Sequence, residues 1–273
     1  MTGSRETEAI ETGLLLQAIH ARYGYDFQGY APDSMRRRVM SALAKSGMRH
    51  LGEVQHRLLT DPDFFASFLG DLTVQVSEMF RDPPSYRAFR TEIVPLLKTY
   101  PQVKVWHAGC ASGQEVYSTV ITLLEEDLLS RCQVYATDIS AQAIEQAREG
   151  MYPEKELDVF AQNYAAAGGT ANPREYCTLA YGRMAFKESL RRHIVFFQHN
   201  LASDYALGEM QVIFCRNVLV YFGEELRRKV VDMFEKALCR GGFLCLGKSE
   251  RPPASSTLAT FVAGQAIYRK IAS

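Results

Sequence analysis

The segment at residues 109–118, GCASGQEVYS, joins two stretches with different hydrophobic patterns, and it limits the folds that this chain can adopt. Before it, residues 102–109 (QVKVWHAG) have the pattern of a strand, and after it residues 115–129 have the apolar spacing of a helix. Strands and helices go on alternating towards the end of the chain, which predicts an α/β fold with a parallel, doubly wound sheet. In such sheets ligands bind beyond the carboxyl ends of the strands, where the strand order reverses.

The hydrophobic pattern divides the chain into two regions. Residues 1–82 are helical in character, with apolar spacing that stops at glycines, and they predict an N-terminal all-helical domain. Residues 83–273 predict a Rossmann-like domain. Within it, residues 152–192 interrupt the alternation with a glycine-containing loop and the segment REYCTLAYGRMAFKESL. This segment predicts a small antiparallel β insertion that turns near Gly182.

Composition excludes several classes of partner. Lys+Arg and Asp+Glu both number 31, so no overall field attracts DNA or an anionic membrane. The six cysteines form no CxxC pair, which argues against a zinc site and a disulfide framework. The first residues lack a signal-peptide core, and no apolar run approaches the roughly 18 residues of a membrane helix. We therefore expect a cytoplasmic protein with no metal, no nucleic-acid partner and no membrane insertion.

Small or polar residues stand at the ends of four predicted strands. Gly109 and Gly113 remove side chains where a nucleoside would approach the backbone, although they would also suit a simple tight turn. Asp138 ends the next strand, where nucleoside-binding folds place the acidic residue that receives ribose hydroxyls, although it could instead cap a helix. The ends of the later strands carry Asn200, Leu201, Arg216 and Asn217.

The loop after the first strand favours one kind of nucleoside. It lacks the Lys-Ser/Thr pair of a phosphate-binding loop, and it lacks the third glycine of a dinucleotide fingerprint. A nucleoside without phosphates fits better, and S-adenosylmethionine is the common one.

Several motifs in this order resemble the chemotaxis receptor methyltransferases, the CheR family. They are DLTVQVSEMFRDP at 71–83, VWHAGCASGQEVYS at 105–118, YATDIS at 135–140, HNL at 199–201 and IFCRNVLVYF at 213–222. The resemblance covers nearly the whole chain. It implies S-adenosylmethionine as cofactor, S-adenosylhomocysteine as product, and methylation of glutamate side chains on the cytoplasmic helices of chemoreceptors. Methyl esters would form there in chemosensory adaptation, with the receptor's cytoplasmic domain as the protein substrate.

The resemblance also implies roles for single residues. The family's Asn-x-Thr-x-x-x-Arg segment corresponds to Gln75, Ser77 and Arg81, where glutamine and serine depart from the usual pattern. Glu115 matches the glutamate that contacts the cofactor, and it suits the methionine amino group. Asp138 matches the ribose-binding aspartate. The remaining cofactor-binding positions implied by the motifs are Gly109, Asn200, Leu201, Arg216 and Asn217.

Two residues are candidates for a catalytic role. Arg81 would hold the cofactor carboxylate or shield the substrate anion, and Tyr221 would line the methyl-transfer channel or, alternatively, serve only in packing. A glutamate substrate is already ionised at neutral pH, so no general base is required. A further departure is Gln114, where the family has a glutamate.

Partner recognition is expected at two places. Arg36, Arg37 and Arg38 lie in one predicted helix, and by analogy with the family they would face the receptor, whereas the plain alternative is a solvated face. In some family members the β insertion docks a peptide from the receptor's C-terminus, and residues 176–189 would do so here. Two other functions stay open: a catalytically silent S-adenosylmethionine-binding regulatory module, favoured only by Gln75 and Gln114, and a methyltransferase for another substrate.

Overall fold

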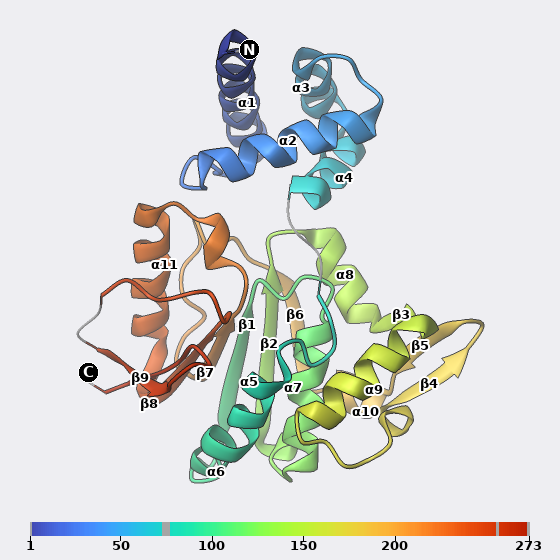
Figure 1. The fold of residues 1–273 in the computed structure, drawn as a ribbon, viewed down its shortest axis with the longest axis vertical. Coiled ribbons are helices and arrows are strands. Elements are labelled where there is room, and N and C mark those ends of the chain that lie inside the picture. Colours follow the sequence, from blue (N-terminus) through green and yellow to red (C-terminus); the bar gives the residue numbers. More distant parts are fainter. Residues whose placement is uncertain (1, 73–76, 255–256, 272–273) are drawn as a thin grey trace.

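The computed structural model describes residues 2–72, 77–254 and 257–271, so the candidate Gln75 lies outside the described residues. Four helices make up the N-terminal region, which lies above the rest of the molecule in Figure 1. Their bounds are α1 (Thr2–Tyr23), α2 (Pro32–Ser46), α3 (Leu51–Thr60) and α4 (Pro62–Leu72). They enclose a hydrophobic core of their own, to which α1 contributes Leu15 and Ile19. The predicted N-terminal helical region is therefore confirmed.

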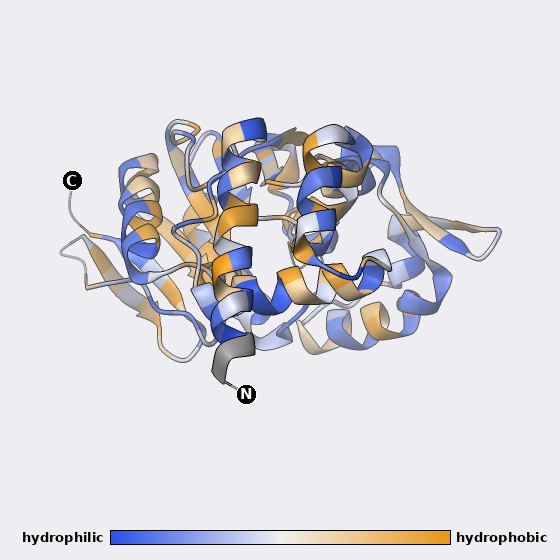
Figure 2. Cartoon of the chain, turned by 90° about the horizontal axis from the view of Figure 1, so that it is seen from above, coloured by the Kyte–Doolittle hydropathy of each residue, from blue (hydrophilic) through white to orange (hydrophobic). Residues whose placement is uncertain are grey.

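The local sequence explains how α2 begins and ends. Pro32 occupies the first turn, where its missing N–H is no loss, and Gly47 follows the last residue with a left-handed φ of 71°. Met35, Val39 and Ala42 recur at helical spacing and are buried. Figure 2 shows that the helices carry both hydrophobic and hydrophilic residues along their length.

The second region is a sheet with helices on both faces. Its connecting and covering helices are α5 (Pro83–Ala88), the π turn η1 (Phe89–Ile93), α6 (Val94–Leu97), α7 (Gln114–Glu125), α8 (Ala141–Glu149), α9 (Leu157–Ala166), α10 (Glu188–Arg191) and α11 (Glu224–Ala237). Short 3-10 turns are η2 (Leu129–Arg131), η3 (Glu154–Glu156), η4 (Pro173–Tyr176) and η5 (Leu219–Tyr221). The strands of the large sheet are β1 (Val103–Ala108), β2 (Cys132–Asp138), β6 (Ile194–Gln198), β7 (Met210–Cys215), β8 (Leu238–Leu246), β9 (Leu258–Val262) and β10 (Ile267–Lys270).

The order of the strands fixes where a ligand can bind. The sheet runs β6-β2-β1-β7-β8-β10-β9, and β1 pairs in parallel with both β2 and β7. From β1 the chain adds β2 and β6 on one side and then returns to add β7 on the other. The strand order therefore reverses at β1, as a doubly wound sheet requires. At the other edge of this sheet, β10 pairs antiparallel with both β8 and β9.

Both faces of β1 are buried, which explains its nearly continuous apolar sequence. Val103 and Val105 enter one hydrophobic core together with residues of α7. Trp106 and Ala108 enter the core on the opposite face together with residues of α11. The alternation places two cores on the two sides of the sheet, and it leaves the carboxyl end of the strand free to form a site.

The small insertion is a separate three-stranded antiparallel sheet in the order β3-β5-β4. Its strands are β3 (Met151–Pro153), β4 (Cys177–Ala180) and β5 (Arg183–Phe186), and it projects to one side of the molecule in Figure 1. Tyr181 and Gly182 make the hairpin turn, both with positive φ, as expected for a two-residue turn. The predicted hairpin is thus confirmed.

Three parts of the sequence fold differently from expectation. The apolar spacing of AQAIEQAREGMY predicts one helix over its whole length, but Gly150 ends α8 with a left-handed φ of 61° and Met151 begins β3. The pattern of the stretch that follows predicts irregular structure, but residues 157–166 form α9. The segments FLCLG and AIYRK predict an antiparallel pair, which β8 and β10 form, and β9 adds a further antiparallel strand at the outer edge. None of the described helices is both long and apolar enough to cross a bilayer.

Candidate cofactor site

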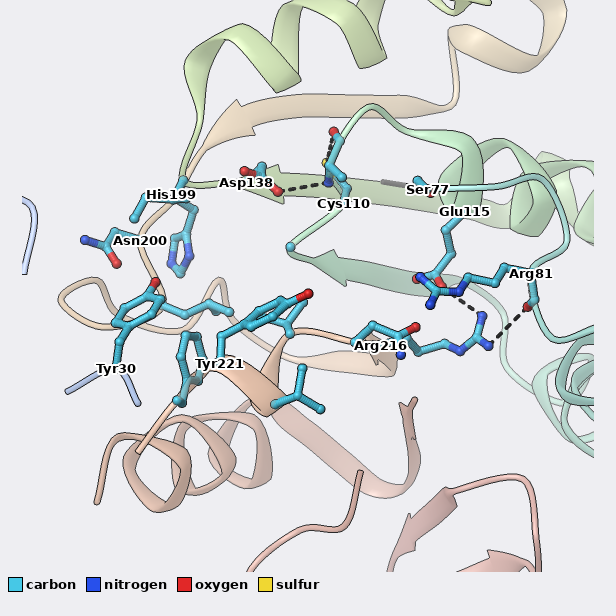
Figure 3. Close-up of a pocket in the computed structure, with 18 of the residues that line it drawn as sticks. Tyr30, Ser77, Arg81, Cys110, Glu115, Asp138, His199, Asn200, Arg216 and Tyr221 are labelled. Carbon is cyan, nitrogen blue, oxygen red and sulfur yellow. Dashed lines mark hydrogen bonds and ion pairs between the residues drawn. The ribbon is translucent and has the colours of Figure 1, made fainter. Parts of the chain in front are cut away.

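A cavity of about 300 Å³ lies at the carboxyl ends of β1, β2, β6 and β7. Figure 3 shows the side chains that surround it. The sequence-predicted residues that line it are Ser77, Arg81, Gly109, Glu115, Asp138, Asn200, Leu201, Arg216, Asn217 and Tyr221. Four strand ends and the segment before α5 therefore meet at one place, as the topology of a parallel sheet requires.

One end of the cavity is built from paired charges. The Arg216 guanidinium donates through Nη1 to Glu115 Oε2 and through Nη2 to Asp82 Oδ2, each at 2.9 Å. The second nitrogen also donates to the Arg81 carbonyl oxygen at 3.1 Å. His107 Nδ1 lies 3.3 Å from the other oxygen of Glu115. Arg216, which directly follows β7, thus links the start of α7 and the segment before α5 through hydrogen bonds.

Electrostatics keep both members of this buried pair charged. Burial by itself raises the pKa of Glu115, but Arg216 and His107 outweigh burial and leave the pKa below its usual value. Burial lowers the pKa of Arg216, yet the neighbouring carboxylates of Glu115 and Asp82 raise the net pKa above its usual value. The site therefore presents a carboxylate and a guanidinium at neutral pH.

Arg81 adds a cation at the same end of the cavity. Its side chain is exposed and extends beside the Glu115–Arg216 pair, as Figure 3 shows. Among the described residues its guanidinium makes no ion pair. A free guanidinium next to a buried carboxylate is complementary to a zwitterionic α-amino acid group, which carries one charge of each sign.

Asp138 stands at the end of β2, in the middle of the cavity wall. Its Oδ2 accepts from the Ala111 N–H and its Oδ1 from the Ser140 N–H, each at 2.9 Å. Burial raises the pKa of this carboxyl, although the backbone hydrogen bonds lower it in part. The bonds fix the direction of the carboxylate, and no described cation forms an ion pair with it. The group is thus available for hydroxyl donors of a ligand.

The loop after β1 can pack closely against the loop after β7 because its first residue is glycine. Gly109 has a left-handed φ of 83°, and a Cβ there would lie 2.5 Å from Val218 Cγ2. The loop after β7 therefore approaches the backbone of the loop after β1 directly. Ala111 and Asn217 also have positive φ, at 48° and 60°, and backbone of this kind is typical of functional sites.

A buried carboxylate that was given no role among the predicted site residues holds the loop after β7. Glu250 is 4% exposed, and its Oε2 accepts from Asn217 N at 2.8 Å and from Gly247 N at 2.6 Å. Its Oε1 accepts from Val220 N at 3.1 Å. Backbone N–H groups thus satisfy this buried carboxylate in place of a cation. The same hydrogen bonds hold the turn that carries Asn217 and Tyr221.

Other cavity residues were missed by the sequence analysis. Tyr30, Glu78, Cys110, His199, Val218 and Phe222 all border the cavity. Cys110 and His199 lie next to predicted positions, so adjacency could have found them. Tyr30 comes from the N-terminal helical region, and no pattern in the sequence links it to the strand ends. Gln114 is absent from the wall of the cavity. It is buried, and its side-chain oxygen accepts from Ser112 at 2.7 Å.

The three arginines of α2 do not form one surface. Arg36 is partly buried and donates to Glu8 at 3.0 Å, whereas Arg37 is exposed at the surface. Arg38 turns the other way and lines the cavity, with its guanidinium carbon 3.9 Å from the centre of the Tyr221 ring. The three side chains point to different sides because consecutive helical residues lie about 100° apart, and their contact with a receptor stays a prediction.

Three features define a nucleoside-binding fold of the S-adenosylmethionine-dependent methyltransferase class. They are the doubly wound sheet, the acidic residue that ends β2, and the glycine-containing loop without a phosphate-binding lysine. Comparison with protein families agrees. The CheR methyltransferase SAM-binding domain matches residues 75–267, and the CheR methyltransferase all-alpha domain matches residues 11–73. The chain belongs to the CheR methyltransferase family, and S-adenosylmethionine is its cofactor.

Individual relatives support the same assignment. The chain is 43% identical to "Putative methyltransferase Cher3" of Pseudomonas putida, over 99% of this chain and 100% of that protein. It is 34% identical to "Chemotaxis protein methyltransferase" of Vibrio parahaemolyticus, over 66% of both chains. It is 30% identical to "Chemotaxis protein methyltransferase 1" of Vibrio cholerae, over 79% of this chain and 80% of that protein.

Proposed function

We propose that this methyltransferase transfers the methyl group of S-adenosylmethionine to glutamate side chains on the cytoplasmic helices of chemoreceptors, in chemosensory adaptation. The names of the relatives support a role in chemotaxis. We also propose the division of the chain at residue 82, between an N-terminal helical domain and the cofactor-binding domain, with the β insertion at about residues 152–192.

The cofactor supplies an electrophilic methyl group on a sulfonium. A glutamate oxygen attacks it, the new O–C bond forms as the C–S bond breaks, and S-adenosylhomocysteine leaves. Because glutamate has a reference pKa near 4.3, the nucleophile is already ionised at neutral pH. The protein would contribute mainly alignment of the reacting atoms, an effect worth up to about 7–11 kcal/mol in favourable cases.

The contacts of the cavity suggest how the cofactor lies. Glu115 would receive the amino group and Arg81 the carboxylate of the methionine part, with Arg216 holding Glu115 in place. Asp138, in the middle of the wall, would receive the ribose hydroxyls. The positions proposed to complete the cofactor site are Gln75, Ser77, Gly109, Asn200, Leu201 and Asn217.

The observation that carries the proposed substrate is the pair of Arg38 and Tyr221. Arg38 brings a guanidinium from the N-terminal domain to the rim of the cofactor cavity, where it stacks on the ring of Tyr221. A cation at this place suits an anionic side chain that enters beside the methyl group. We propose that Arg38 attracts the glutamate carboxylate and that Tyr221 lines its path. Arg36 and Arg37 would lie further out along the receptor helix.

Methyl transfer from radiolabelled S-adenosylmethionine to the cytoplasmic fragment of a cognate receptor tests this function. We expect base-labile label that is released as methanol, since a carboxyl methyl ester hydrolyses in alkali. A receptor fragment whose methylatable glutamates are changed to alanine is the matched control. Base-stable label, or equal label on the control fragment, would contradict glutamate esterification.

We further propose that a receptor C-terminal peptide pairs with the small sheet. Strand β4 pairs only with β5, so its other edge offers backbone groups to an added strand. Titration with such peptides measures this directly. A proline placed within the pairing segment of the peptide should abolish binding, whereas equal binding of both peptides would exclude strand addition.

A further inference from the structure

The segment of residues 24–31, which joins α1 to α2, runs across one end of the cavity. We call it the interdomain segment. At one side, Gln198 at the end of β6 donates to the Tyr25 hydroxyl and to the Ile139 carbonyl oxygen. At the other side, the Ala31 N–H donates to the Tyr221 carbonyl oxygen at 2.9 Å. The segment therefore spans from the strand end of β6 to the loop after β7.

Backbone contacts hold the segment tightly to the cofactor-binding domain. Gly223 N–H donates to the Gly29 carbonyl oxygen at 2.7 Å, and Tyr30 forms an antiparallel bridge with Phe222. A Cβ on Gly223 would lie 2.9 Å from that same oxygen, and a Cβ on Gly29 would lie 3.0 Å from Leu226. Both glycines thus permit an approach that larger residues would prevent.

Tyr30 is placed by this arrangement so that it borders the cavity. Its ring packs edge to face against Phe222, with 4.9 Å between the ring centres, and against Phe27 on the other side, at 5.2 Å. Figure 3 shows its hydroxyl directed towards the side of the cavity where Asn200 and His199 lie. Within the described part of the chain this hydroxyl has no hydrogen-bond partner.

The position of Tyr30 relative to the charged residues indicates which part of the cofactor it meets. In Figure 3, Glu115, Arg216 and Arg81 lie at one end of the cavity, Tyr30 lies at the other, and Asp138 lies between them. Burial raises the pKa of Tyr30, and the nearby carboxylate of Asp138 raises it further. The hydroxyl therefore stays protonated and can donate a hydrogen bond.

We propose, given the cofactor orientation proposed above, that Tyr30 is a cofactor-binding residue supplied by the N-terminal domain and that its hydroxyl hydrogen-bonds the adenosine part of the cofactor. Bound cofactor then ties the interdomain segment to the strand ends. Since α2 begins at Pro32, directly after this segment, cofactor occupancy also fixes the helix that carries Arg38. Cofactor affinity and the docking of the N-terminal domain are linked in this way.

Calorimetric titration with S-adenosylhomocysteine tests the contact. Tyr30→Phe, which removes only the hydroxyl, should weaken binding about 3- to 10-fold, the usual effect of one lost hydrogen bond. Tyr23→Phe is the matched control, because the Tyr23 hydroxyl donates to the Leu58 carbonyl oxygen inside the N-terminal domain. We expect the control to bind with unchanged affinity. Equal affinity of wild type and Tyr30→Phe would overturn the proposal.

A second ligand localises the contact. The same loss should be found with 5′-methylthioadenosine, which lacks the amino acid part. A loss seen with S-adenosylhomocysteine alone would place Tyr30 at the wrong end and overturn the assignment. Failure of the wild-type protein to bind S-adenosylhomocysteine would instead refute the cofactor site itself.

Hydrogen exchange measures the linkage between the domains. S-adenosylhomocysteine at saturation should slow amide exchange in residues 24–31 of the wild-type protein, and it should slow it less in Tyr30→Phe at equal saturation. The far side of α3 serves as an internal reference, because it lies away from the cavity. Exchange in residues 24–31 that does not respond to the ligand would overturn the linkage.

Discussion

Arg38 lies over Tyr221, with its guanidinium carbon 3.9 Å from the centre of the ring. The two residues come from different regions of the chain, α2 and the turn after β7. Burial lowers the pKa of Arg38, whereas Tyr221 and Tyr30 raise it in part, and the guanidinium remains charged at any physiological pH. Arg38 Nη1 donates to the Leu72 carbonyl oxygen, and the five donors of a guanidinium leave others that can meet a carboxylate.

The first prediction concerns this pair. Arg38→Ala should lower kcat/KM for receptor methylation by about tenfold or more, because it removes both the attraction for the carboxylate and the support of the Tyr221 ring. S-adenosylhomocysteine affinity should change far less. Lys45→Ala is the control, since it removes an exposed cation from the same helix. A loss of equal size in the control would show that only the general charge of α2 matters.

The second prediction follows from the pKa of Glu115. Because its pKa is lowered in the folded protein, this carboxylate stabilises the fold above its ordinary pKa of 4.5, and the contribution is lost as the pH falls through the folded value. Glu115→Gln leaves Arg216 buried with a weaker partner and should cost about 3 kcal/mol or more at pH 7. Urea unfolding at pH 7, 5.5 and 4 measures the difference between the two proteins. It should shrink towards acid, and a difference that grows would contradict this account.

The third prediction concerns the close approach at Gly109. Gly109→Ala places a Cβ against Val218 Cγ2 and puts a non-glycine residue at positive φ, so it should abolish S-adenosylhomocysteine binding and destabilise the fold. The double variant with Val218→Ala removes the clash and leaves only the backbone strain, about 1–2 kcal/mol. A double-mutant cycle on thermal stability should therefore show positive coupling. Additive effects would mean that the loop moves aside without cost.

The fourth prediction concerns Glu250. Glu250→Gln replaces one acceptor oxygen by a donor that faces backbone N–H groups, and it should destabilise the protein by about 1–3 kcal/mol. Because the turn that carries Tyr221 loosens, kcat should fall more than S-adenosylhomocysteine affinity. Glu224→Gln on the exposed start of α11 is the control. A pure loss of affinity with unchanged kcat would argue against a role in positioning Tyr221.

Much of the cofactor site could be predicted from the sequence, because parallel strands bring their carboxyl ends to one edge. Once the strands were recognised, Asp138, Asn200 and Arg216 had to lie near the loop after β1. The glycine at 109 indicated a close approach, although nothing in the sequence identified Val218 as the neighbour. Periodicity gives the position of a residue along its element and gives no information about which distant loop it meets.

The rest depended on how the two domains meet, which no local pattern records. Tyr30 reaches the cavity only because residues 24–31 pair with the loop after β7. The basic triplet of α2 looked like one surface in the linear sequence, yet the turn of the helix separates Arg38 from Arg37. The role of Glu250 could not be predicted because its partners are backbone N–H groups, which every residue other than proline carries.

The hydrogen bond from the Ala31 N–H to the Tyr221 carbonyl oxygen connects the N-terminal helices directly to the loop after β7. Ala31 immediately precedes the first residue of α2, and Tyr221 is the last residue of the turn beside the cavity. A swing of the N-terminal helices away from the sheet must break this bond before α2 can leave. The loop beside the cavity would then lose a restraint at the moment of separation, so undocking of the N-terminal helices and loosening of the cavity wall would happen together.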